Sequence, residues 1–160
     1  MRRILFLLCG LGVLGFLGLQ VRDAEALIAS GEVILLDLAP VDPRSMMQGD
    51  YMRLAFAIER QVKSSDTEDA DPAPAVILAV DGRRVATFRR FAAEGGAGPG
   101  EYAFRVRRDG TSIRIEPHSF LFQEGRADEF AKARYGIFRV DATGRHLLTG
   151  LADAEAKRID

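Results

Sequence analysis

Pro40-Val-Asp-Pro-Arg-Ser-Met-Met-Gln-Gly-Asp-Tyr-Met-Arg-Leu-Ala-Phe56 is the stretch around which the rest of the chain is organised. Its first half cannot be regular structure, because Pro43 biases Asp42 toward extended geometry and Asp42 can accept backbone hydrogen bonds in a turn. From Gly49 onward, apolar and more polar residues alternate. One face carries Met52, Leu54, Phe56 and Ile58, and the other carries Tyr51, Arg53, Ala55 and Ala57. This period of two predicts a strand with one face in the core.

The remainder of the chain is rich in further strand patterns. The apolar run 33–39 predicts a strand covered on both faces. Turn signals at Asp81-Gly82, Asp109-Gly110 and 141–144 each separate two strand-like runs, which predicts three hairpins. Helical spacing predicts one short helix near 126–135, ended by Gly136. We therefore expect a mainly-β (α+β) domain, either an antiparallel sheet or a small barrel, with one short helix packed on it.

The N-terminal segment is strongly apolar. Residues 4–19 contain no charged or strongly polar side chain, and with Gln20 and Val21 the run reaches about 18 residues, or roughly 27 Å of helix. This length predicts a single transmembrane helix. A cleaved signal peptide is the alternative, supported by Ala24-Glu25-Ala26 but weakened by the charges just before it. A buried soluble helix is a third possibility.

Charge placement predicts the orientation of this segment. Arg2 and Arg3 precede it, so the positive-inside rule places the N-terminus in the cytoplasm. The following domain then lies in the periplasm or at the cell exterior. The expected organisation is a transmembrane anchor over 1–21, a juxtamembrane linker over 22–31, a β-rich domain over 32–152 and a polar tail over 153–160.

Several separated motifs resemble one known family. The octet Gly49-Asp-Tyr-Met-Arg-Leu-Ala-Phe56 resembles the signature of the GDYXXLXY protein family, with Phe56 in place of the last tyrosine. The runs 40–44, 120–125, 133–136 and 147–151 are also similar to it, in the same order. The family comprises small bacterial proteins with one N-terminal membrane anchor and no assigned activity, encoded beside multi-spanning membrane proteins. The resemblance implies a membrane partner. Phe56 matters only if the family uses the hydroxyl of its tyrosine.

The sequence contains no strong catalytic or metal-binding pattern. His118 and His146 are the chain's two histidines, lie far apart, and are expected to be structural or surface residues. No catalytic residue, cofactor or metal ligand is therefore predicted. Ser45-Met46 before Gly49-Asp50 faintly resembles the nucleophile region of signal-peptidase-like serine proteases, which pair serine with a lysine. An anchored hydrolase of that type is the alternative function.

The candidate site consists of polar residues within or beside the resembling motifs. These residues are Asp42, Arg44, Gly49, Asp50, Tyr51, Glu124, Arg134 and Tyr135. We expect the 40–51 loop to pack against the 120–135 segment, with Arg44 or Arg134 paired with Asp50 or Glu124. The groups then either hold turns together or form a small recognition groove.

Charge excludes one class of partner and suggests another. The formal net charge of −1 carries no basic bias, so no nucleic-acid partner is expected. Arginines nevertheless concentrate on the two central hairpins, at positions 83, 84, 89, 90, 105, 107 and 108. They form either a solvated sheet face or a patch for anionic lipid or polysaccharide. The leading prediction is a membrane-anchored extracytoplasmic binding or accessory domain that acts with an integral membrane protein.

Overall fold

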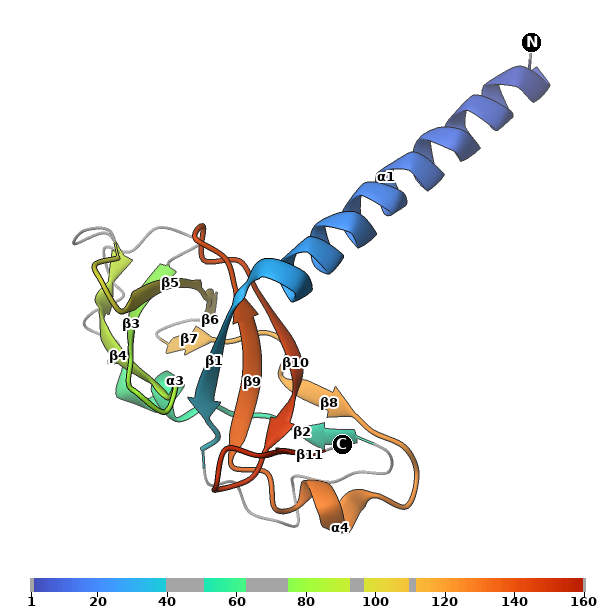
Figure 1. The fold of residues 1–160 in the computed structure, drawn as a ribbon. Helices are drawn as coiled ribbons and strands as arrows, with labels where there is room; N and C mark the ends of the chain where they lie inside the picture. Colours follow the sequence, from blue (N-terminus) through green and yellow to red (C-terminus); the bar gives the residue numbers. More distant parts are fainter. Residues whose placement is uncertain (1, 40–50, 63–74, 93–96, 110–111, 160) are drawn as a thin grey trace.

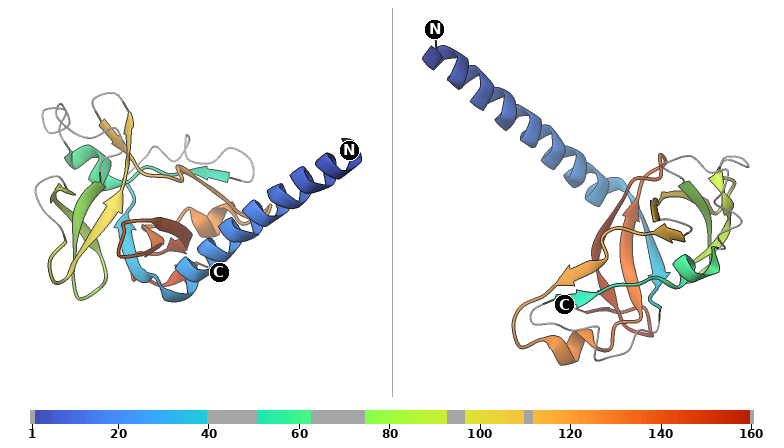
Figure 2. Two further views of the ribbon diagram at one scale, coloured as in Figure 1. Left: turned by 90° about the horizontal axis from the view of Figure 1, so that it is seen from above. Right: turned by 180° about the vertical axis from the view of Figure 1, so that it is seen from behind.

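A long helix projects from a curled β-domain (Figures 1 and 2). The structure, a computed structural model, describes residues 2–39, 51–62, 75–92, 97–109 and 112–159, with the backbone alone at residues 2 and 5–7. Helix α1 spans Arg2–Ser30. Within this described part, no helix combines the length and the apolarity needed to cross a membrane.

Helix α1 continues without a break through residues 22–30, for which the sequence predicts either a helical extension or a juxtamembrane linker, stopped at Gly31, and its last turns pack on the domain. Leu27 is buried there. The helix ends at Gly31, as predicted. The Gly31 N–H donates to the Leu27 carbonyl at 2.9 Å. Arg139 Nη1 in turn donates to the Gly31 carbonyl at 2.8 Å. The exit from the helix is therefore fixed by hydrogen bonds from both sides.

The first sheet has four antiparallel strands in the order β1-β9-β10-β11. They are β1 (Glu32–Asp37), β9 (Tyr135–Val140), β10 (His146–Ala152) and β11 (Arg158–Ile159). Ile34 and Leu36 of β1 enter the main core, whereas Leu35 packs with Ile137 and Ala152 in a smaller cluster on the other face. The prediction of a strand covered on both faces is confirmed, and so is the hairpin across 141–144.

The second sheet has three strands in the order β4-β3-β5. They are β3 (Ala75–Val80), β4 (Ala86–Phe91) and β5 (Glu101–Arg105). Leu35 of β1 meets Val85 in a single parallel bridge, and Arg105 N–H donates to the Gly144 carbonyl at 2.9 Å. The two sheets thus curl toward each other as a half-barrel (Figure 1). The mainly-β prediction and the hairpin at Asp81 are confirmed.

Two short ribbons and two short helices complete the part of the domain that the structure describes. Strand β2 (Tyr51–Arg53) pairs with β8 (Ser119–Leu121), and β6 (Arg107–Asp109) pairs with β7 (Ser112–Arg114). The helices are α3 (Ala57–Gln61) and α4 (Ala127–Phe130). The ribbon formed by β6 and β7 corresponds to the hairpin predicted at Asp109-Gly110.

Aromatic rings fill the space between the sheets. Phe138 of β9 makes edge contacts with Phe56 at 5.5 Å and with Phe104 at 5.4 Å between ring centroids. All three side chains have no exposed surface. Such edge-to-face pairs are favoured over stacked pairs by the ring quadrupoles. Phe56, the residue that departs from the family signature, is therefore a core residue.

The predicted strand over 51–58 is wrong in length but right in its faces. Met52, Leu54, Phe56 and Ile58 are all at most 6% exposed. However, the strand ends at Arg53 and helix α3 starts at Ala57, because Glu59 Oε2 accepts the Phe56 N–H at 3.1 Å and stabilises a helical first turn. Ile58 reaches the core from a helix instead of a strand.

The predicted helix near 126–135 is also wrong in extent, since α4 covers only Ala127–Phe130. The backbone of Arg134 already belongs to the sheet: its N–H donates to the Ala152 carbonyl at 2.7 Å and its carbonyl accepts the Leu38 N–H at 2.9 Å. These bonds use the groups that a longer helix would need. Tyr135 is accordingly the first residue of β9.

Three turns share one design that the sequence analysis did not identify. In the turns that start at Asp81, Asp141 and Asp153, Oδ1 accepts the N–H groups two and four residues later, at 2.8–3.1 Å. The residue three positions after each aspartate has a positive φ, at Arg84, Gly144 and Ala156. The first turn was predicted as a two-residue Asp-Gly turn. It is longer, because Arg84 and not Gly82 takes the left-handed conformation.

Candidate functional site

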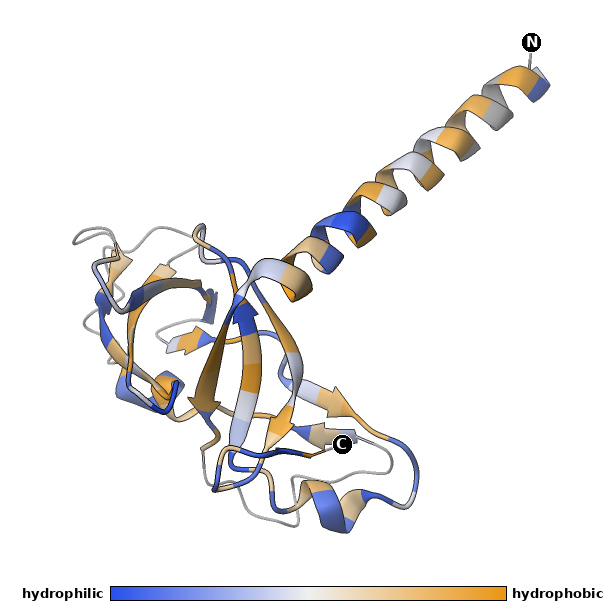
Figure 3. Ribbon diagram, viewed as in Figure 1, coloured by the Kyte–Doolittle hydropathy of each residue, from blue (hydrophilic) through white to orange (hydrophobic). Residues whose placement is uncertain are grey.

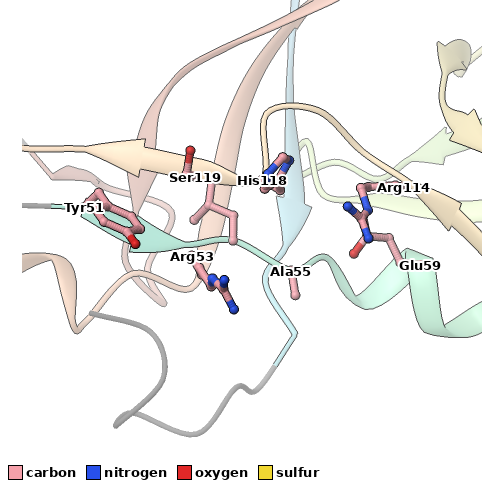
Figure 4. Close-up of a pocket in the computed structure, with 8 residues that line it drawn as sticks. Tyr51, Arg53, Ala55, Glu59, Arg114, His118 and Ser119 are labelled. Atoms are coloured by element: carbon pink, nitrogen blue, oxygen red, sulfur yellow. The ribbon is translucent and has the colours of Figure 1, made fainter. Parts of the chain in front are cut away.

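A cleft of about 540 Å³ opens beside strand β2, and its walls come from segments far apart in the sequence (Figure 4). Strand β2 and the residues after it contribute Tyr51, Arg53, Leu54 and Ala55. The alternation of the strand explains this placement, since Met52 points into the core while its neighbours Tyr51 and Arg53 face the cleft. The strand that supplies core residues therefore also supplies one wall of the cleft.

Glu59 forms part of the opposite wall and is held by backbone groups. Its Oε2 accepts the Phe56 N–H at 3.1 Å and its Oε1 accepts the Ile115 N–H at 2.8 Å. The carboxylate thus joins α3 to the segment that follows β7. Because both oxygens are already engaged, Glu59 positions the wall and is a poor candidate for acid–base chemistry.

The remaining wall residues are Arg114 of β7, His118 and Ser119. Arg114 forms an ion pair with Asp109 across the β6–β7 ribbon, and His118 Nδ1 lies 3.0 Å from Glu116 Oε2. The side chains of Arg114 and His118 remain 48% and 57% exposed. Both therefore stay accessible from solvent while their positions are restricted.

A second depression, of about 300 Å³, adjoins the cleft and shares two of its residues, Arg114 and His118. Arg107 and Arg108 of β6 contribute further guanidinium groups there. Arg107 Nη1 lies 3.8 Å from Glu116 Oε1, which makes this ion pair loose. Polar, mainly cationic side chains therefore line a continuous surface.

The predicted site residues are only partly located. Asp42, Arg44, Gly49 and Asp50 lie outside the described residues, so their predicted contacts stay predictions. Tyr51 lines the cleft. Glu124, Arg134 and Tyr135 line neither depression, and the cleft residues outside β2 and α3 come from 114–119. Tyr51 pairs with Leu121, and the rest of the predicted packing between 40–51 and 120–135 stays a prediction.

Arg134 has a structural role. Its Nε lies 2.9 Å from Asp37 Oδ1, and its Nη2 donates to Asp37 Oδ2 at 3.1 Å. This pair joins the end of β1 to the turn before β9. The guanidinium of Arg134 thus pairs with Asp37, and the predicted pairing of Arg44 or Arg134 with Asp50 or Glu124 stays a prediction, since Arg44 and Asp50 lie outside the described residues. A residue in β1 was not considered as a partner, since it lies outside the motifs that carried the resemblance.

The two histidines differ in environment. His146 stacks on Phe104, with 3.8 Å between ring centroids, and its Nε2 lies 3.1 Å from the Glu116 carbonyl. Burial lowers the pKa of His146, although its contacts with backbone carbonyls act in the opposite direction. His146 is thus a half-buried residue with a structural role, in agreement with the prediction that the histidines are structural or surface residues. His118 lies at the surface but lines the cleft.

The arginines of the central hairpins separate in space. Arg90 donates from both Nη atoms to Glu101 at 3.0 Å, and Arg105 Nε donates to the Thr143 carbonyl at 3.2 Å. Arg107 and Arg108 are the members of the predicted patch that line the second depression. Arg53 and Arg114 were missed as site residues. The alternation around Met52 contained the signal for Arg53, whereas Arg114 required the fold.

The described residues contain no group of three His, Cys, Asp or Glu side chains close enough to hold a metal ion. Ser45 and Lys63, two residues considered for the hydrolase alternative, lie outside this part of the chain. The located side chains are suited to binding an anionic group. Guanidinium groups recognise carboxylate or phosphate oxygens through paired N–H donors.

Comparisons with known proteins agree with the motifs. A search of the curated proteins and a search of the solved structures found no match. The family model described as GDYXXLXY protein matches residues 13–151, a range that contains the β2 signature, strands β1 to β9 and all residues of the cleft. The match covers most of the chain, which therefore belongs to the GDYXXLXY protein family.

Proposed function

We propose that this protein is a binding domain, held at a bacterial membrane by its N-terminal segment, that presents the cleft beside β2 to an integral membrane protein. The proposal keeps the domain in the periplasm or at the cell exterior and the N-terminus in the cytoplasm. It assigns no reaction to the cleft, since the located groups are suited to recognition.

One observation carries the proposal: the family signature divides between packing and cleft. Met52 and Phe56 have no exposed surface, whereas Tyr51, Arg53 and Ala55 line the cleft. Arg53 and Ala55 stand at unspecified positions of the signature, but its specified residues also divide, with Phe56 in the core and Tyr51 in the cleft. The same short strand thus couples the core to an accessible polar surface.

Membrane attachment is supported by the surface of α1. The large apolar side chains described between Ile4 and Val21 are 51–69% exposed, and Figure 3 shows an apolar helix with a hydrophilic band before it reaches the domain. Contiguous apolar surface of this kind is rarely left in water and marks contact with lipid or protein. In the folded domain, Leu121 is the other strongly exposed large apolar residue among those described.

Site-specific photo-crosslinking in intact bacteria tests the proposal. A photoreactive phenylalanine analogue replaces Arg53 in the full chain, and a matched variant carries it at Arg89, which is exposed on β4 and lines neither depression. We expect an ultraviolet-dependent adduct with a membrane protein from position 53 and none from position 89. Alkaline carbonate extraction of the same cells should leave the chain in the membrane pellet.

Two results would contradict the proposal. Equal adducts from both positions would show that the cleft is not the binding surface. Release of the full chain by carbonate would show that the N-terminal segment does not hold it in the membrane. Mass spectrometry of the adduct identifies the partner in the favourable case.

A further inference from the structure

The two depressions form one continuous cationic groove. We define the groove by Arg53, Arg107, Arg108, Arg114 and His118; Arg114 and His118 belong to both depressions. The volumes of about 540 and 300 Å³ are each larger than a single small anion needs. The groove therefore has room for several linked groups.

The β6–β7 ribbon concentrates positive charge in this groove at an energetic cost. Arg107 and Arg114 are direct cross-strand partners. Like charges in that position destabilise an antiparallel pair. Asp109 and Glu116 offset part of this repulsion through ion pairs with Arg114 and Arg107.

The carboxylates that line the two depressions do not neutralise all of the positive charge there. The two depressions are lined by four arginines and by three carboxylates, Glu59, Asp109 and Glu116. Both oxygens of Glu59 already accept backbone N–H groups. Within the described residues, the exposed side chain of Arg53 has no ion-pair or hydrogen-bond partner. Arg53 thus offers the groove a guanidinium group that forms no ion pair with the other residues that line it.

We infer that the groove binds an acidic segment of a polypeptide, with carboxylates on Arg53 at one end and on Arg114 and Arg107 at the other. This inference rests on the proposed function and names the chemistry of the partner. A peptide is favoured over a lone phosphate because the cations extend over two adjoining depressions. Leu54 and Ala55 add apolar wall between the guanidinium groups, which suits the side chains between two acidic residues.

The test uses the full chain in nanodiscs of zwitterionic phosphatidylcholine and a fluorescein-labelled hexaglutamate peptide. Hexaglutamine carries the same label as the neutral control. Fluorescence anisotropy should show binding of hexaglutamate alone, weakened by added salt. Arg53→Gln and Arg114→Gln should each weaken it about threefold to tenfold, and Arg89→Gln should leave it unchanged.

The outcomes separate this inference from the proposed function. Equal binding of the two peptides, or equal effects of Arg53→Gln and Arg89→Gln, would overturn the acidic-segment inference. Displacement of hexaglutamate by inorganic phosphate more effectively than by chloride at equal ionic strength would reassign the groove to a free anion. If either happens while position 53 still crosslinks to a membrane protein, the proposed function stands and only the ligand chemistry fails.

Discussion

Replacing Gly136 by alanine tests the packing on which the β2 signature depends. Gly136 is buried in β9, where a Cβ atom would lie 3.0 Å from Phe56 Cε1, 3.1 Å from Phe138 Cε2 and 3.3 Å from Leu148 Cδ1. Optimal contacts between carbon atoms are about 3.5–4.0 Å, so all three neighbours must move. Two of them are rings with no exposed surface, which leaves little room for relaxation.

The expected cost follows from two opposing terms. Inserting a methyl group into a well-packed core costs about 1–3 kcal/mol. Replacing a glycine inside a strand recovers about 0.5–1 kcal/mol, because alanine loses less backbone entropy on folding. We therefore expect Gly136→Ala to lower the free energy of unfolding by about 1–2 kcal/mol, which is roughly 2–8 °C in Tm for a chain of this size.

Urea unfolding of the full chain in detergent, followed by far-UV circular dichroism, measures the change. Gly82→Ala is the matched control, since a Cβ at Gly82 meets nothing within 4 Å. It should leave stability unchanged or raise it slightly. Phe56→Leu removes the ring edge nearest to Gly136, so the cost of Gly136→Ala should be smaller in that background by at least about 0.5 kcal/mol.

The result that would refute this reasoning is a simple one. If Gly136→Ala is as harmless as Gly82→Ala, the Phe56 ring does not lie against β9. If the effects of Gly136→Ala and Phe56→Leu add, the two residues are not in contact. Either result would remove the assignment of the signature's inward face to the core.

Three further predictions concern the helix exit and the aspartate turns. Gly31→Ala should cost about 2 kcal/mol or more by urea unfolding, because its Cβ would lie 2.5 Å from the Leu27 carbonyl oxygen, a backbone atom. Arg84→Gly should raise Tm, because Arg84 has a φ of 65° that glycine adopts more easily. Gly144→Ala should lower Tm, because Gly144 has a φ of 80° and an added Cβ would lie 3.1 Å from the β5 backbone. Each change should be about 1 kcal/mol, and the two changes must have opposite signs. Burial raises the pKa of Asp141, but the hydrogen bonds to its carboxylate outweigh burial and lower the pKa from 3.8 to about 2. The ionised carboxylate therefore stabilises the fold above about pH 4, and this stabilisation is lost as the pH falls through about 2. Asp141→Ala should therefore lower the free energy of unfolding by about 1 kcal/mol at neutral pH, allowing for solvent screening, and by less near pH 2. Melting curves of both proteins over a pH series measure this, and a difference in stability that does not change with pH would contradict the prediction.

The positions of side chains relative to the core were predictable because burial follows a local period. Met52, Leu54 and Phe56 alternate with polar neighbours, and the structure buries all three. Hairpins were predictable for a similar reason, since the residues that turn the chain are adjacent in sequence. The length of each element was less predictable. Strand β2 stops at Arg53 because Glu59 caps a helix that the alternating pattern concealed.

The candidate site was less predictable from the sequence than the fold. Tyr51 was predicted and lies in the cleft, whereas Glu124, Arg134 and Tyr135 line neither depression. Arg134 is bound to Asp37, a residue 97 positions earlier, and the cleft is closed instead by Arg114 and His118. No periodicity connects these positions, because their proximity arises from the pairing of β2 with β8 and of β6 with β7.

By itself the sequence determined the strand-rich class, the inward face of the signature, the hairpin at Asp81 and the family, since each of these depends on residues close together in the chain or on motifs in a fixed order. The tertiary structure alone decided which charges meet. The ion pairs of Arg134 and Arg114, the stacking of His146 on Phe104 and the gathering of Arg53 with Arg107 in one groove are set by strand pairing and sheet curvature. Ion pairs act over a few ångströms of space, and distance along the chain does not predict distance in the fold.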